Sequence, residues 1–168
     1  MKDKLENIWY HYKAPILIIS AILLVLVYFA FQKASIQTTD YQAAIVSPDY
    51  YSEEAVTALS EALKSHGTDL NGDGIITVQV VSYHIVLGAE NQNVNEIGAL
   101  DADLVGKNSG LFFLADPMAF ETSTNGICLF KDAAPVSSFD FLSGLGFDSL
   151  YAVVRPDHPD AEDYKMLF

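Results

Sequence analysis

Cysteine is almost missing from this sequence, which contains only Cys128 among its 168 residues. A single cysteine cannot form an internal disulfide or a multi-cysteine zinc site, so disulfide-stapled scaffolds and most zinc folds are excluded. Cys128 lies between the apolar residues Ile127 and Leu129. We therefore expect a buried, unreactive thiol at this position rather than a nucleophile.

Basic residues are also scarce. Nine Lys and Arg stand against 22 Asp and Glu, which gives a formal net charge of -13. Because nucleic acid is itself a polyanion, a phosphate-binding surface is not expected, and we predict no nucleic-acid partner. A chain of this charge is better suited to binding cations.

Motifs that indicate catalysis are absent as well. The sequence has no G-x-S-x-G, Walker A or G-x-G-x-x-G motif, from which a nucleophile or a phosphate loop could be assigned. Its histidines are too scattered to form an H-E-x-x-H zinc site. They are His11, His66, His84 and His158. The chain is therefore predicted not to be an enzyme.

The sequence does contain one long hydrophobic run, over residues 14–31, with no charged or strongly polar side chain. At a rise of about 1.5 Å per residue, such a helix covers most of a hydrocarbon core of roughly 30 Å. Aromatic residues such as Trp9 and Tyr28 lie near its two ends, as is usual at membrane interfaces. The run predicts a transmembrane helix over 14–31, with the lipid bilayer as its partner.

The distribution of charge predicts the orientation of this helix. Lys2, Lys4 and Lys13 precede the run, whereas the chain after Lys33 carries 5 basic and 20 acidic residues. The positive-inside rule then predicts a single-pass protein of the cell membrane, with a cytoplasmic N-terminus (1–13) and an extracytoplasmic C-terminal domain.

A cleaved signal peptide is the competing interpretation of the hydrophobic run. Signal peptides have an apolar region of about 7 to 15 residues followed by a site with small residues. Here the run is longer, and residues 29–34 offer no clean small-x-small pair. We therefore favour an uncleaved anchor, followed by a short polar tether over 32–40 and one domain over 41–168.

Within this domain, segments typical of strands alternate with segments typical of helices. Residues 41–47 form an apolar run that ends at Pro48, which predicts a buried strand. Residues 52–65 place apolar side chains at helical spacing behind Ser52, a suitable N-cap. The same patterns predict a strand over 75–87, a helix over 93–105 and a strand over 110–115. This alternation favours an α/β fold: a single three-layer lobe with a mainly parallel sheet.

The C-terminal part of the sequence is less regular. It predicts a strand over 126–131, a loop with a helical turn over 137–147, a strand over 150–155 and a last helix from Asp160. Asp116 follows the third predicted strand, at the edge where α/β folds place ligand-binding residues. The favoured interpretation is that Asp116 is an ordinary turn residue before Pro117, without such a role.

The strongest local motif is the run DLNGDG at residues 69–74. Alternating oxygen-bearing side chains on a tight turn can converge on one hard cation, as in the first half of a calcium loop. The expected ligands are the side chains of Asp69, Asn71 and Asp73 and the carbonyl of Ile75. The twelfth position of the loop is Val80 instead of the bidentate Glu of an EF-hand, so an EF-hand is excluded.

Calcium could still bind here if another carboxylate or water completes the shell, with Glu90, Asp101 and Asp103 as candidates. The expected affinity is then weak, about 10⁻⁴ to 10⁻³ M, and the role structural. The alternative is a turn rich in Asn, Asp and Gly that joins a helix to a strand without any ion.

Taken together, the strand ended by Pro48, the DLNGDG run, the stretch ALDADLVGKNSGLFFLADP and the late LYAVVR resemble a known family. They look like one lobe of a type 2 periplasmic-binding-protein-like (extracellular solute-binding) domain, in a small membrane-anchored bacterial protein. The resemblance covers roughly residues 41–155 and implies fold and location. A second lobe has no room in this chain, so a cleft that closes around a solute is not expected within one copy.

We therefore expect a membrane-anchored extracytoplasmic domain that binds a protein or solute partner outside the cell without catalysis, stabilised by calcium if the loop holds an ion. The alternative is a solute-binding lobe that completes a ligand cleft by dimerisation. An extracytoplasmic enzyme is the least favoured interpretation.

Overall fold

The computed structural model describes residues 15, 17–28, 39–89, 93–128 and 130–168. The chain divides into two compact units, Met1–Thr38 and Thr39–Phe168. In the first unit the described residues are helical. The ends of the predicted membrane helix, at residues 14 and 29–31, lie outside the described residues. Among the helices that are described, none combines the length and the apolar character needed to cross a membrane.

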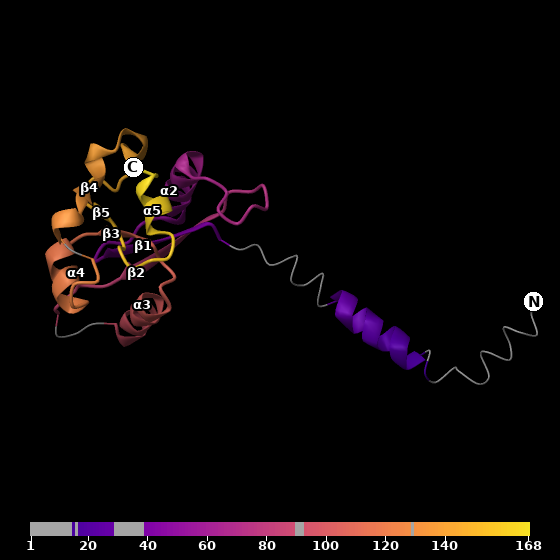
Figure 1. Cartoon of the computed structure of the whole chain (residues 1–168). Helices are drawn as coiled ribbons and strands as arrows, with labels where there is room; N and C mark the ends of the chain where they lie inside the picture. Colours follow the sequence, from indigo (N-terminus) through magenta and orange to yellow (C-terminus); the bar gives the residue numbers. More distant parts are fainter. Residues whose placement is uncertain (1–14, 16, 29–38, 90–92, 129) are drawn as a thin grey trace, which may run out of the picture. The chain divides into compact units, whose positions relative to one another are not determined.

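The second unit contains a five-stranded sheet with the strand order β2-β1-β3-β5-β4 (Figure 1). Its strands are β1 (Tyr41–Ser47), β2 (Val78–His84), β3 (Leu111–Leu114), β4 (Ala134–Pro135) and β5 (Tyr151–Val154). Its α-helices are α2 (Glu53–His66), α3 (Val94–Gly106), α4 (Pro117–Ser123) and α5 (Ala161–Lys165). Three short 3-10 turns complete it: η1 (Phe130–Asp132), η2 (Val136–Ser138) and η3 (Asp140–Leu142). The predicted α/β class is confirmed.

The sheet is mixed, and the prediction of a mainly parallel sheet holds only for its first three strands. β1 runs parallel to both β2 and β3, whereas β5 runs antiparallel to β3 and to β4. Between β4 and β5 the chain forms only the two 3-10 turns η2 and η3. Because no helix carries the chain back along a face of the sheet there, it reverses direction and enters β5 antiparallel.

Helices cover both faces of the sheet, which gives three layers (Figure 1). On one face α2 and α5 bury Leu59, Leu63 and Tyr164 against the side chains of β1 and β3. On the other face α3 buries Leu100 and Leu104 together with residues of the same strands. Adjacent residues of β1 and β3 alternate between the two cores, so both central strands are buried on both sides.

α2 and α3 begin where the sequence predicts, because each has a side-chain cap. Ser52 accepts a hydrogen bond from the Ala55 N–H at 3.2 Å and caps α2. Asn93 caps α3 through the N–H of Asn95. The strand predicted over 126–131 was wrong: Asn125 and Gly126 have positive φ angles and end α4 in a turn. Neither they nor the rest of that segment pairs with the sheet among the described residues.

Candidate functional site

The carboxyl ends of the three parallel strands meet at one edge of the sheet. β1 ends opposite β2, with Ser47 aligned with His84, and Val46 is aligned with Leu114 of β3. The chain therefore brings together three segments that leave these strands, at residues 47–48, 85–87 and 115–116. We refer to these three segments as the carboxyl edge. This is the edge at which open α/β sheets bind their ligands.

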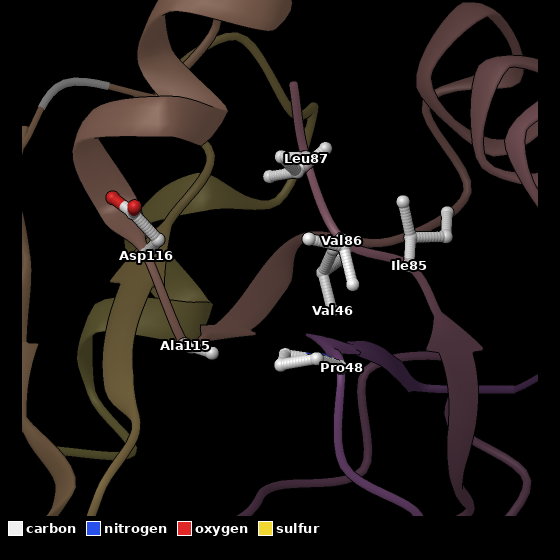
Figure 2. A pocket seen from close by; sticks show the side chains of 7 residues that line it. All are labelled: Val46, Pro48, Ile85, Val86, Leu87, Ala115 and Asp116. Carbon is white, nitrogen blue, oxygen red and sulfur yellow. The ribbon is translucent and has the colours of Figure 1, made fainter. Parts of the chain in front are cut away.

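The carboxyl edge contains a hollow of about 240 Å³ with an apolar lining (Figure 2). Val46 lines it from β1 and Val86 from the segment that follows β2, and Val86 is 55% exposed. The full lining consists of Val46, Pro48, Ile85, Val86, Leu87, Ala115 and Asp116. Asp116 is the only one with a charged side chain, so the hollow suits an apolar group next to a polar or cationic one.

Asp116 also lines a second hollow, of about 350 Å³, which adjoins the first. Its other walls come from Gly88 and from α4, including Met118, which is 61% exposed. The Asp116 carboxylate points away from Val86 and Leu87 (Figure 2), and its Oδ1 accepts a hydrogen bond from the Ala119 N–H at 2.9 Å. Asp116 thus caps α4 and separates the two hollows. This residue, which the sequence analysis named at the end of the third predicted strand, therefore lies at the centre of this surface.

An aromatic pair borders the carboxyl edge. The rings of Tyr50 and His84 are stacked, with centroids 3.6 Å apart and planes at 21°. Tyr50 is 84% exposed, so the pair presents a flat aromatic surface to solvent. Nδ1 of His84 is buried and has no hydrogen-bond partner within the described residues. The sequence analysis missed this pair, because the residues are 34 positions apart and no local pattern links them.

The predicted calcium loop forms a turn stabilised by its own side chains. Asp69 accepts hydrogen bonds from the N–H groups of Gly72 and Gly74, at 2.6 and 2.7 Å. Asn71 accepts one from Asp73, and Asp73 accepts one from Ile75. Within the described part of the chain, no three His, Cys, Asp or Glu side chains come close enough to hold a metal ion. The calcium site therefore stays a prediction.

Asp40, assigned to the tether by the sequence, instead anchors this loop to the sheet. Its side chain accepts hydrogen bonds from the N–H groups of Leu70 at 2.9 Å, Asn71 at 3.1 Å and Thr77 at 2.7 Å. The residue is buried, at 6% exposure. An acidic residue directly before a buried strand was the only signal that could have indicated this role.

Of the three carboxylates proposed to complete the calcium shell, the two that the structure describes, Asp101 and Asp103, do not gather at the loop. Asp103 is buried elsewhere and accepts hydrogen bonds from the hydroxyls of Tyr83 and Ser109, at 2.9 and 2.7 Å. Burial and the bond to Asp103 hold the pKa of the Tyr83 hydroxyl above its usual range. Asp101 is exposed on α3, and Glu90 lies outside the described residues.

Cys128 is buried in the core formed by α3 and α4, as expected. Burial raises the pKa of its thiol to about 12, so the thiolate needed for nucleophilic chemistry is strongly disfavoured.

A cluster of charged side chains joins Arg155 to Asp157 at 2.5 Å, with Lys107 at 3.0 Å from the same carboxylate. The hydrogen bond from Arg155 is the main reason that the pKa of Asp157 is lowered to about 2.

These features together provide a surface suited to binding. The carboxyl edge offers two adjoining hollows, exposed apolar side chains and one carboxylate, and it can hold an apolar group beside a cationic one. The resemblance to a solute-binding lobe stays a prediction. Comparisons of this chain with protein families, with curated proteins and with solved structures found no match.

Proposed function

We propose that this protein is a non-catalytic, membrane-anchored binding domain that contacts its partner through the carboxyl edge. The observation that carries the proposal is the pair of hollows that share Asp116 where β1, β2 and β3 end. In open α/β sheets this edge is the usual place for a ligand. The anchor is the hydrophobic run 14–31, with residues 1–13 in the cytoplasm and the domain outside the cell.

Taken by itself, the first hollow favours a protein partner over a small solute, whereas the adjoining hollow of about 350 Å³ is large enough for a small solute. Pockets that enclose a small molecule usually have volumes of about 300 to 1,000 Å³. The hollow beside Val86, at about 240 Å³, is smaller and suits one apolar side chain of a partner. The exposed Val86 and Met118 would then be covered on binding. A solute-binding lobe that completes its cleft by dimerisation is the alternative.

Site-specific photo-crosslinking in intact cells tests the binding edge. A benzoylphenylalanine placed at Val86 or Met118 is expected to give a crosslinked product of the same mass in the full chain. The control position is Thr57, which is exposed on α2, away from these hollows. In a chain that carries benzoylphenylalanine at position 86, the additional substitution Met118→Asp should reduce the yield of crosslinked product. Equal yields from Thr57 would contradict the proposal.

The proposed orientation is tested separately with a thiol reagent that does not cross membranes. A cysteine at Glu162, whose side chain is 82% exposed, should be labelled in intact cells. A cysteine at Asp3 should be labelled only after lysis. The native Cys128 is buried and should react in neither case. The reverse pattern would show that the domain lies inside the cell.

A further inference from the structure

β2 forms an open end of the sheet. The strand order β2-β1-β3-β5-β4 leaves β2 and β4 as the two outer strands. β4 has two residues, whereas β2 has seven and pairs along its whole length with β1. An outer strand of this length presents a row of backbone N–H and C=O groups to whatever lies beside it. The open edge of β2 is therefore the longer of the two.

The hydrogen bonds at the two ends of β2 show which of its backbone groups face away from β1. The C=O of Thr77 accepts from the N–H groups of Asp40 and Tyr41, and the N–H of Ile85 donates to the C=O of Ser47. Residues of β2 with odd numbers therefore face β1, because backbone groups alternate along a strand. The even-numbered residues face away from β1.

Two of these outward residues have no backbone partner in the part of the chain that the structure describes. The C=O of Val78 is satisfied by the hydroxyl of Ser60 on α2, at 2.8 Å. Within the described residues, the N–H and C=O groups of Val80 and Ser82 make no hydrogen bond. Ser82 is also exposed at its side chain. The centre of β2 is thus free to pair with another strand.

The sequence of this edge lacks the devices that usually prevent such pairing. Natural edge strands carry Lys, Pro or bulges that discourage a second strand. From residue 74 to residue 89 there is no Asp, Glu, Lys, Arg or Pro, the longest stretch without charge in 39–168. Three of the seven residues of β2 are Val, a β-branched residue that favours strand pairing.

We propose that β2 pairs with β2 of a second copy of this chain, antiparallel about a two-fold axis near Val81. Val80 of each copy then lies opposite Ser82 of the other, and each pair exchanges both backbone hydrogen bonds. One continuous sheet passes through both copies. A strand that pairs with itself under two-fold symmetry needs no other partner sequence.

The absence of charge at this edge permits a second copy as the occupant, although the domain as a whole is strongly acidic. Residues 39–168 carry 20 acidic and 5 basic side chains, so two copies repel each other over most of their surfaces. The uncharged stretch around β2 is where two acidic domains can come into contact without placing like charges opposite each other. Salt should therefore strengthen this association, because it screens the remaining repulsion. A basic partner would instead bind less tightly as the salt concentration rises.

The test measures the oligomeric state of the full chain in detergent micelles by sedimentation equilibrium, at about 0.05 and 0.5 M salt. We expect a dimer that dissociates less readily at high salt. Ser82→Pro removes an N–H that faces away from β1, so the fold keeps its own hydrogen bonds while the dissociation constant rises at least tenfold. Ser82→Ala, which keeps the N–H, is the matched control and should remain dimeric.

Two further variants keep the proposal testable if Ser82→Pro does not fold. Ser82→Lys adds a charge at the edge and should also weaken the dimer at least tenfold. Position 81 lies at the proposed two-fold axis, so a Val81→Cys variant should form an intermolecular disulfide on oxidation. A Thr57→Cys variant, with its cysteine on α2, should not. A full chain that is monomeric at both salt concentrations, or a dimer unchanged by both Ser82→Pro and Ser82→Lys, would overturn the proposal.

Discussion

The ring of Tyr164 lies directly against Gly110, and its hydroxyl accepts a hydrogen bond from the backbone N–H of Gln42 at 2.7 Å. α5 is thereby fixed to β1 and to the residue before β3. A Cβ at position 110 would overlap the edge of the ring. Tyr164 is itself almost fully buried, at 2% exposure, so the ring has no free space to move into.

This contact predicts that Gly110→Ala lowers the free energy of unfolding by about 2 to 4 kcal/mol, because overpacking in a buried site forces side chains or backbone to shift. Gly98→Ala is the matched control. Gly98 lies within α3 with no atom near its missing Cβ, so alanine should be neutral or stabilise by up to about 1 kcal/mol. Urea unfolding followed by circular dichroism measures both. Equal effects would contradict the close contact.

His158 predicts a dependence of stability on pH. Burial is the main cause that lowers the pKa of its imidazole below 6.5, and the nearby Asp160 opposes it. Its Nδ1 accepts a hydrogen bond from the Asp160 N–H at 3.1 Å, which requires an unprotonated nitrogen. The folded state thus binds this proton less readily than the unfolded state. Stability should be full above pH 6.5 and fall as the pH drops below it.

His158→Asn is the matched variant for this prediction, because its side-chain oxygen can still accept the bond from the Asp160 N–H but does not titrate. Thermal melts from pH 8 downward should show a smaller loss of Tm near pH 6 in the variant than in the wild type. A loss of the same size in both proteins would assign the pH dependence to other groups.

The hydrogen bonds of Asp40 predict that the conservative substitution Asp40→Asn strongly lowers the free energy of unfolding. Asp40→Asn replaces one acceptor oxygen by an NH₂ group, so a partly buried N–H of Leu70 or Thr77 faces a donor and stays unsatisfied. An unsatisfied buried group costs about 1 to 3 kcal/mol, which is the expected destabilisation. Hydrogen exchange at Leu70 and Thr77 should accelerate as well. Asp49→Asn changes an exposed carboxylate and should alter stability by less than about 0.5 kcal/mol.

The DLNGDG loop, at which calcium binding is predicted, gives the fourth prediction. Calorimetric titration of calcium into the protein should show saturable binding with a Kd of about 10⁻⁴ to 10⁻³ M, and excess calcium should raise Tm. Asp73→Ala should abolish both effects, whereas Asp148→Ala, at an exposed position outside the loop, should leave both intact. No heat and no change in Tm would reduce DLNGDG to a turn held by its own hydrogen bonds.

The elements whose signals are local could be predicted from the sequence. β1 spans Tyr41–Ser47 as predicted, because an apolar run ends there at Pro48. α2 follows Ser52 as predicted, since cap, acidic first turn and apolar stripe all agree. The direction of β5 could not be predicted, because it depends on how the irregular chain over 136–150 packs.

The candidate site could be predicted only in part from the sequence, because most of it depends on contacts between distant segments. Asp116 could be singled out because the carboxyl end of a parallel strand is a local position. The hollows beside it, and the stacked Tyr50 and His84, depend on segments that meet only in the folded sheet. The role of Asp40 was hidden because its partners lie 30 to 37 residues further along the chain.

The strand order also constrains how this domain is made. β1, β2 and β3 can pair with each other as soon as each has been synthesised. β4 cannot, because its partner β5 comes later in the chain and lies between it and β3. Tyr164, which fixes the start of β1, is made later still. A nascent chain therefore carries an unfinished sheet, with one side of β3 unpaired, until residues 151–165 have been synthesised. During that interval the unpaired side of β3 is a site at which the chain is prone to aggregate.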